Sequence, residues 1–225
     1  MQYQKTVLDN GVVVLSETMD SVRSVSLGIW FQVGSRDENE FEAGLSHFNE
    51  HMMFKGTPSK SAREISELFD RYGARQNAFT SREATCYYAQ FIDESLENTF
   101  ELISDMVLHS ELEQSACELE REVIIEEIAR SEDDPEDRVY ELFARSFNPG
   151  HEISKPIAGT KESVSSFGSK EAHAYHEKHY HANNCVVVAV GNVKHEDLVA
   201  LAQKYLSELR VGKKNTALSR VLPSL

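Results

Sequence analysis

The sequence has few cysteines. Only Cys86, Cys117 and Cys185 occur in 225 residues, and they are far apart and never form a C-x-x-C pair. An odd number of widely spaced cysteines argues against a disulfide framework and against a zinc site built from thiolates. We therefore expect the three side chains to be small, buried hydrophobic groups.

Long hydrophobic runs are also absent. No apolar run reaches the roughly 18 residues of a membrane-spanning helix. Residues 1–17 lack the basic and then hydrophobic order of a signal peptide. We therefore expect a soluble protein that is made and kept in the cytoplasm and has no membrane partner.

Basic residues are scarce relative to acidic ones. The 23 Lys and Arg stand against 37 Asp and Glu, which gives a formal net charge of -14. Such a chain repels nucleic-acid phosphates and anionic lipids, so we expect no nucleic-acid partner. With 40% hydrophobic and 27% charged positions, 225 residues can bury a sizeable core. This composition excludes the class of chains that are disordered tails throughout.

Strand patterns and helix patterns come in separate runs. The strand patterns cover residues 4–8, 11–17, 24–35, 74–81, 84–92 and 183–193. The helical patterns cover 40–54, 61–73, 94–110, 113–132, a segment opened by Asp134-Pro135, 168–180 and 196–209. Because strict βαβ alternation is missing, the order predicts the α+β class, with a mainly antiparallel sheet covered by helices. We expect one compact lobe over residues 1–210 and a linker or tail over 211–225.

The sharpest chemical pattern is His47-Phe48-Asn49-Glu50-His51. Residues four apart share one face of a helix, so the two imidazoles can converge on one metal ion with Glu50 beside it. Zinc suits such a pair, and a catalytic zinc needs a third protein ligand and an open position for water. The neighbouring carboxylate can then take the proton of that water as it attacks a carbonyl.

The helical segment 113–132 offers candidates for the third ligand. At about 100° per residue, Glu120 and Glu127 lie within about 20° of each other on a partly apolar stripe, whereas Glu122 and Glu126 point elsewhere. A carboxylate on such a stripe is costly to bury unless a positive charge compensates it, and a metal ion would do so.

Each of these patterns also has an ordinary explanation. The histidines and Glu50 would otherwise form a solvated polar helix face, and the two glutamates an acidic surface face. A second histidine group has four members, of which the first three recur at every third position and drift by about 60° per step, so they cannot all meet one ion and we expect an exposed helix end there. Its members are His173, His176, His179 and His181. We expect the acidic run 132–137 to be a solvated helix cap.

Three segments, GLSHFNEHMMFKGT, NAFTSREATCYYA and ELEREVIIEEI, occur in this order. In order and spacing they resemble the N-terminal lobe of the inverted-zincin peptidases of the pitrilysin family (M16), most closely the branch of the mitochondrial processing peptidase and bacterial processing proteases. The resemblance covers nearly the whole chain and implies a zinc-dependent endopeptidase. It makes His47, His51 and Glu127 the ligands of Zn2+ and Glu50 the general base. Glu120 matches an acid that supports those ligands.

The resemblance also implies a substrate-binding edge strand made of Gln76, Asn77, Ala78, Phe79 and Thr80. The free edge of a strand offers N–H and C=O groups that pair with an extended peptide, nearly regardless of its sequence. The expected substrates are therefore extended or unfolded peptides. The small Ala78 would let the peptide backbone come close.

Two features depart from the family pattern. Asn49 stands where members commonly have Leu, and a polar amide there can loosen the packing behind the helix. Members usually have a second, similar lobe, so the resemblance implies a second lobe or a homodimer as partner and little activity for one lobe alone.

Two alternatives to an enzyme stay open. The first is a non-catalytic lobe that binds peptides or assembles with a peptidase, against which the intact HFNEH pattern argues. The second is a structural zinc domain, which would need a fourth protein ligand that the sequence does not offer.

Overall fold

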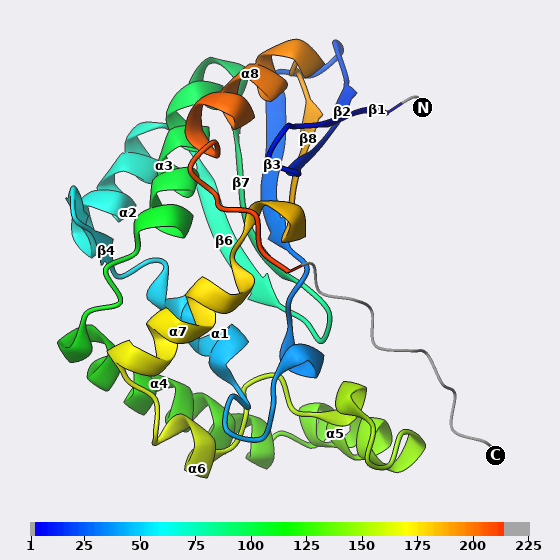
Figure 1. Cartoon of the computed structure of the whole chain (residues 1–225), viewed down its shortest axis with the longest axis vertical. Coiled ribbons are helices and arrows are strands. Elements are labelled where there is room, and N and C mark those ends of the chain that lie inside the picture. Colours follow the sequence, from blue (N-terminus) through cyan, green and yellow to red (C-terminus); the bar gives the residue numbers. More distant parts are fainter. Residues whose placement is uncertain (1–2, 214–225) are drawn as a thin grey trace.

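The computed structural model describes residues 3–213, and Figure 1 shows its layers. One layer is a six-stranded sheet in the order β1-β2-β8-β3-β7-β6. Its strands are β1 Gln4–Val7, β2 Val13–Thr18, β3 Ser24–Phe31, β6 Arg75–Thr80, β7 Thr85–Ile92 and β8 Cys185–Gly191. Every neighbouring pair is antiparallel except β2 and β8. The predicted α+β class with a mainly antiparallel sheet is thus confirmed.

The helices form the rest of the molecule. They are α1 Leu45–Met52, α2 Ala62–Arg71, α3 Leu96–His109, α4 Gln114–Asp133, α5 Pro135–Phe147, α6 Lys161–Val164, α7 Ser169–His179 and α8 His195–Tyr205. A small two-stranded sheet joins β4 Gly56–Thr57 to β5 Lys60–Ser61. Helix α3 packs against β3 and β7, and α8 packs against β2. Helix α1 lies between β6, α4 and α7, so it sits where the sheet meets the lower helices in Figure 1.

Local sequence signals explain several element ends. Ser61 and Glu64 form a capping box at the start of α2, and Asp134 accepts from two N–H groups at the start of α5. Ser81 N–H donates to the carbonyl of Ala84 at 2.8 Å and closes the β6–β7 hairpin. The helical pattern over 40–54 was too long a prediction, because α1 begins only after Gly44, whose φ of 101° lies outside the helical region.

The core lies between the sheet and the helices. Alternate residues of β3 and β8 are buried, including Val25, Leu27, Ile29 and Val187, as expected for a sheet covered on one face. All three cysteines are buried and free, as predicted. Across residues 3–213 no helix is both long and apolar enough to cross a bilayer.

The second histidine group differs from its prediction. His179 and His181 are buried, with 3% and 1% of their surfaces exposed, and His176 Nε2 lies 2.8 Å from the carbonyl oxygen of Val107. The prediction of an exposed helix end was therefore wrong for these residues. Helix α7 packs against α1, and the segment that follows it pairs with residues 210–212. Of the predicted tail, residues 214–225 lie outside the described residues.

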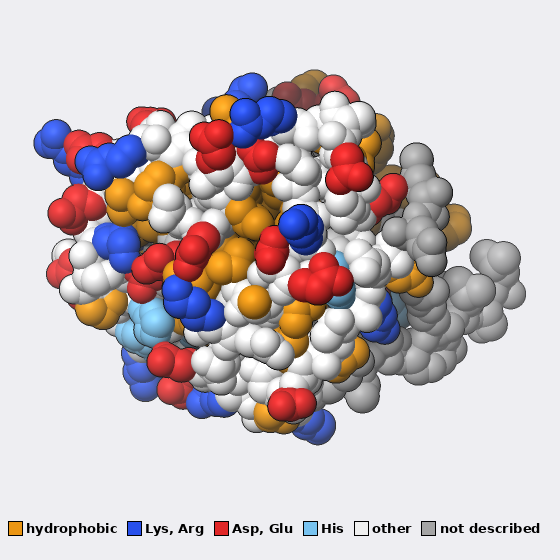
Figure 2. Space-filling model, turned by 90° about the horizontal axis from the view of Figure 1, so that it is seen from above, with side chains coloured by type: hydrophobic (Ala, Val, Ile, Leu, Met, Phe, Trp, Pro, Cys, Tyr) orange, Lys and Arg blue, Asp and Glu red, His pale blue; other side chains and the backbone are white. Residues whose placement is uncertain are grey.

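The excess acidic charge is spread out on the face shown in Figure 2. Acidic and basic side chains lie interspersed there. Elements far apart in the sequence also form ion pairs, such as Lys204–Glu97 at 2.9 Å and Arg23–Asp93 at 2.7 Å. That face therefore carries no block of one sign of charge.

Candidate active site

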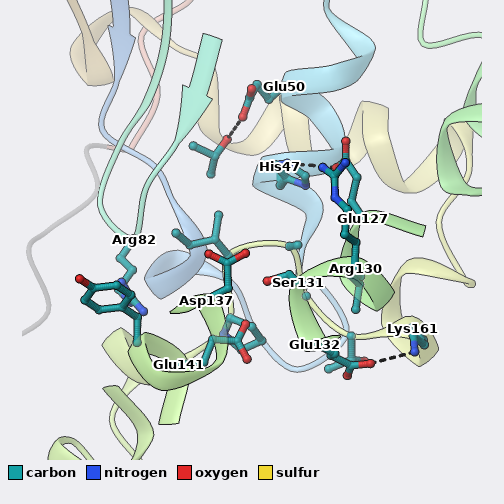
Figure 3. A pocket seen from close by; sticks show the side chains of 18 of the residues that line it. His47, Glu50, Arg82, Glu127, Arg130, Ser131, Glu132, Asp137, Glu141 and Lys161 are labelled. Carbon is teal, nitrogen blue, oxygen red and sulfur yellow. Dashed lines mark hydrogen bonds and ion pairs between the residues drawn. The ribbon is translucent and has the colours of Figure 1, made fainter. Parts of the chain in front are cut away.

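A cleft of about 800 Å³ opens beside α1 and brings together residues far apart in sequence. Its walls include His47 and Glu50 from α1 and Glu127 from α4 (Figure 3), together with Thr80 from β6. Ala78 and Phe79 also line it. Gln76 and Asn77, although predicted to bind substrate, do not reach this cleft.

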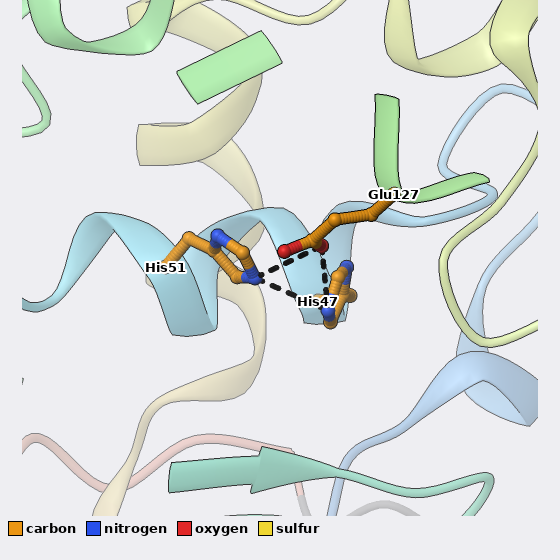
Figure 4. Close-up of side chains that lie close together, drawn as sticks. All are labelled: His47, His51 and Glu127. Carbon is orange, nitrogen blue, oxygen red and sulfur yellow. Dashed lines mark hydrogen bonds and ion pairs between the residues drawn. The ribbon is translucent and has the colours of Figure 1, made fainter. Parts of the chain in front are cut away.

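The two histidines of α1 face each other. Four residues apart on one helix, their Nε2 atoms lie 3.2 Å apart and their rings meet edge to face at 4.5 Å. Helix α4 places Glu127 against the pair, with Oε2 at 3.7 Å from His51 Nε2 and 4.0 Å from His47 Nε2 (Figure 4). One possible ligand atom from each residue lies within 4.8 Å of the other two.

This donor set fits zinc. Tetrahedral ligands at about 2.0–2.2 Å from zinc lie about 3.3–3.6 Å from one another, close to the observed spacings. Two imidazoles and one carboxylate leave a fourth position open, as in catalytic sites and unlike closed structural ones. Within the described part of the chain, these three residues form the one group with metal-ligand spacing. Their role as ligands stays a prediction.

Glu120 lies behind the histidines. Its Oε1 is 2.7 Å from His51 Nδ1, and its other oxygen pairs with Lys55. In the neutral tautomer with the proton on Nδ1, the His51 Nδ1–H group donates to Glu120. The lone pair of Nε2 is then directed at His47 and Glu127. The sequence pattern suggested that both glutamates are buried. Glu120 is, with 6% exposed, but the Glu127 side chain is 37% exposed.

The two imidazoles have opposite pKa shifts. Burial, aided by the charge of His51, lowers the pKa of His47 to about 4, so this ring is neutral at pH 7. Burial also opposes protonation of His51, but its hydrogen bond with Glu120 and the charges of Glu127, Glu120 and Glu50 outweigh it and raise its pKa. A metal ion would displace the His51 proton, since ligating imidazoles are deprotonated.

Glu50 points to the end of β6. Thr80 Oγ1 donates to Glu50 Oε2 at 2.6 Å (Figure 3). Burial raises the pKa of Glu50, and the Thr80 hydrogen bonds offset part of that rise. A carboxylate with a raised pKa is a better proton acceptor near neutral pH than one in water.

Strand β6 is an edge of the sheet, as the resemblance implied. Because Ser81 bonds to Ala84, the antiparallel alternation directs the backbone N–H and C=O groups of Gln76, Ala78 and Thr80 away from β7. Ala78 N–H already has a partner, the Oδ1 of Asn77 at 2.9 Å. The edge thus offers outward backbone groups beside the cleft.

Asn49 lies on the face of α1 that meets α7. The residue is fully buried, and its Nδ2 donates to the carbonyl of Ala172 in α7 at 3.2 Å. Its Oδ1 has no partner among the described residues. The amide therefore ties α1 to α7 and leaves one buried acceptor unsatisfied.

Sequence reasoning missed two parts of the site. Helix α5 forms a wall of the cleft through Asp137, Tyr140, Glu141 and Arg145. Asp137, Glu141 and Arg145 are four residues apart and Tyr140 is three after Asp137, a helical-face signal that the sequence already contains. The bond between Thr80 and Glu50 joins elements 30 residues apart and has no local signal.

Comparisons with known proteins identify the family. The model of the insulinase family (peptidase family M16) matches residues 13–161, and the model of the peptidase M16 inactive domain matches residues 166–223. An uncharacterized zinc protease of Mycobacterium leprae is 39% identical over 213 residues, which are 95% of this chain and 48% of that protein. The uncharacterized zinc protease YmxG of Bacillus subtilis is 38% identical over 211 residues, 94% of this chain and 51% of its own length.

Solved structures agree on the fold. A protease from Helicobacter pylori superimposes with a TM-score of 0.88 at 24% identity, over 99% of this chain and 53% of that one. The chain spans about half the length of the curated relatives it matches. With a family model over 13–161 and relatives near 40% identity along almost its whole length, the chain belongs to peptidase family M16, the insulinase family.

Proposed function

We propose that this chain is the catalytic lobe of a zinc-dependent endopeptidase that hydrolyses extended or unfolded peptides. The observation that carries the proposal is the convergence of His47, His51 and Glu127 beside a cleft that also holds Glu50. In this proposal residues 1–210 form the lobe and 211–225 a linker or tail. The cytoplasmic location stays a prediction.

The ligand roles follow from the donor atoms. The Nε2 atoms of His47 and His51 face each other and Glu127. Glu120 holds Nδ1 of His51. A metal ion that displaces the proton between the two imidazoles would meet both Nε2 atoms. Glu120 acts on the metal only through His51, as a positioning residue. A bound zinc ion would supply Lewis-acid activation of the scissile carbonyl and the attacking water.

Glu50 is the proposed general base. It takes a proton from the attacking water and later delivers a proton to the leaving amine. Thr80 holds one of its oxygens, which fixes the orientation of the carboxylate and restrains its pKa. The side chain thus stands between the metal ligands and the substrate strand.

The substrate is proposed to bind as an added strand along β6. The outward backbone groups of Gln76, Ala78 and Thr80 can pair with an antiparallel peptide. Ala78 and Thr80 lie on the cleft, so the paired peptide would pass beside Glu50. Because a folded chain cannot offer a free strand, extended peptides are favoured.

A second lobe is part of the proposal. The curated relatives are about twice as long as the matched region. Electrostatic catalysis is weak where bulk water reaches the reacting groups, so we propose a second M16 lobe, or a second copy of this chain, as the cover of the cleft. One lobe alone is expected to bind zinc and to show little activity.

Zinc content tests the proposal directly. After dialysis, we expect about one zinc per chain in the wild type and little in His47→Ala or Glu127→Gln. Glu126→Gln is the matched control, because this exposed neighbour loses the same charge without losing a ligand. Undiminished zinc in His47→Ala and Glu127→Gln, or no zinc in the wild type, would refute the assignment.

A further inference from the structure

Helix α1 begins without a cap of its own. Its N-cap residue is Gly44, which has no side chain to accept the first N–H groups. Glu38, six residues earlier, takes that place: its Oε2 accepts from Gly44 N–H and its Oε1 from Ser46 N–H, both at 2.8 Å. One carboxylate thus holds two backbone N–H groups at the positive end of the helix.

This carboxylate is buried. Glu38 is only 3% exposed, and burial raises its pKa to about 7, although the bonds from Gly44 and Ser46 and the charge of Lys155 pull it down. The short side chain of an ordinary N-cap residue, Ser or Asp, would accept such bonds with less desolvation. Glu38 is therefore a costly cap for an eight-residue helix, which points to a demand on geometry beyond stability.

The first turn of α1 is also fixed from its other side. Ser46 Oγ lies 2.6 Å from the hydroxyl of Tyr175 in α7, and Tyr175 is almost fully buried. Ser46 is thus held through its N–H by Glu38 and through its hydroxyl by Tyr175. The next residue along the chain is His47, so any shift of this turn moves the first imidazole.

We propose that Glu38 is a positioning residue of the metal centre. By fixing the first turn of α1, it sets where His47 stands relative to Glu127. Two turns of helix are too short to be stable without outside contacts, so the anchored end determines the place of the side chains that follow. The inference rests on the proposed metal site.

The test compares zinc affinity, by competition with a chromophoric chelator, in the wild type, Glu38→Gln and Glu40→Gln. Gln keeps the size of the side chain, but its NH2 group cannot accept the second N–H. Glu40 lies exposed in the same loop, so its variant controls for the lost charge. We expect zinc to bind Glu38→Gln about tenfold or more weakly and Glu40→Gln within about twofold of the wild type.

Thermal unfolding of the metal-free variants separates positioning from folding. Weaker zinc binding by a Glu38→Gln chain that is fully folded at the assay temperature supports positioning. The inference is overturned if Glu38→Gln binds zinc with wild-type affinity. It is also overturned if the loss of zinc affinity is fully explained by the fraction of unfolded chains. If Glu38→Gln does not fold, the test uses Glu38→Asp, which keeps the charge but has a side chain one methylene shorter. We expect weaker zinc binding in this variant, and wild-type zinc affinity would also overturn the inference. A wild type that binds no zinc refutes the metal site itself, which is a different result.

Discussion

Helices α1 and α5 line the same cleft and are built in contrasting ways. Five of the eight residues of α1 are buried, and the helix is held by the sheet, α4 and α7. None of the thirteen residues of α5 is buried, and its main contacts are with α4 and the short turn Glu152–Ser154. Its apolar side chains Tyr140, Phe143 and Phe147 are each more than 60% exposed.

The contrast separates two tasks. Groups that must converge on one ion need a rigid support, and α1 supplies it. A cleft wall that meets substrates needs less order, and segments with few buried contacts open at low free energy. The proposed chemistry thus has its support in α1, whereas α5 has few contacts that would stop it from moving or from packing against a covering lobe.

The largest expected effect comes from Glu50→Gln on α1. In an assembly that hydrolyses a peptide, we expect the rate to fall by about 10²–10⁴ while zinc stays bound, since the amide keeps the shape but accepts no proton. Glu136→Gln removes a carboxylate from the exposed face of α5 and should change the rate less than twofold. Peptide cleavage and zinc content, measured together, check both variants. A Glu50→Gln rate within tenfold of the wild type would show that Glu50 is not the base.

Truncating one phenylalanine in each helix measures the difference in packing. Phe48 is fully buried and meets the ring of Phe167 at 5.6 Å, so Phe48→Ala should lower the free energy of unfolding by about 3–5 kcal/mol. Phe143 is 63% exposed and stacks only on Phe147, so Phe143→Ala should cost about 1 kcal/mol or less. Urea unfolding of the single lobe gives both values. Equal losses of unfolding free energy in the two variants would show that α1 and α5 are packed equally well.

The pH dependence of stability tests the buried cap of α1. The pKa of Glu38 is raised from its ordinary 4.5 to about 7. A raised carboxyl pKa gives stability that is fully present below pH 4.5 and is lost as the pH rises through about 7. The melting temperature of Glu38→Gln should therefore rise relative to that of the wild type as the pH goes from 5 to 8. The difference between Glu136→Gln and the wild type should not change over this range. Melting temperatures across that range check the sign, and a gain toward low pH would contradict it.

The smallest expected effect is a shift of a pH profile. Thr80→Val removes the hydroxyl that lowers the pKa of Glu50, so this pKa should rise further. The acid limb of kcat/KM should then move to higher pH by less than about one unit. The α5 variant Glu136→Gln should leave the limb in place. If the acid limb of kcat/KM has the same midpoint pH in Thr80→Val as in the wild type, the hydrogen bond from Thr80 does not lower the pKa of Glu50.

Local periodicity predicted much of the site. The four-residue spacing of His47 and His51 and the seven-residue spacing of Glu120 and Glu127 follow from helix geometry alone, and the structure brings these side chains together. The start of α1 was missed because it depends on Glu38, a residue of the preceding loop. The burial of His181 was missed for a similar reason, since it depends on tertiary packing.

The place of β8 in the sheet has a consequence for synthesis on the ribosome. This strand lies between β2 and β3, although it is made about 150 residues after them. During synthesis, β3, β7 and β6 can pair once residue 92 has been made, when α1 is already present, and α4 follows by residue 133. In contrast, the pair of β1 and β2 has no other neighbour in the sheet until β8 is complete at residue 191. The half that carries the proposed metal centre can thus assemble early. The hairpin of β1 and β2 keeps an unpaired strand edge, which is open to non-native pairing, until one of the last elements of the lobe is made.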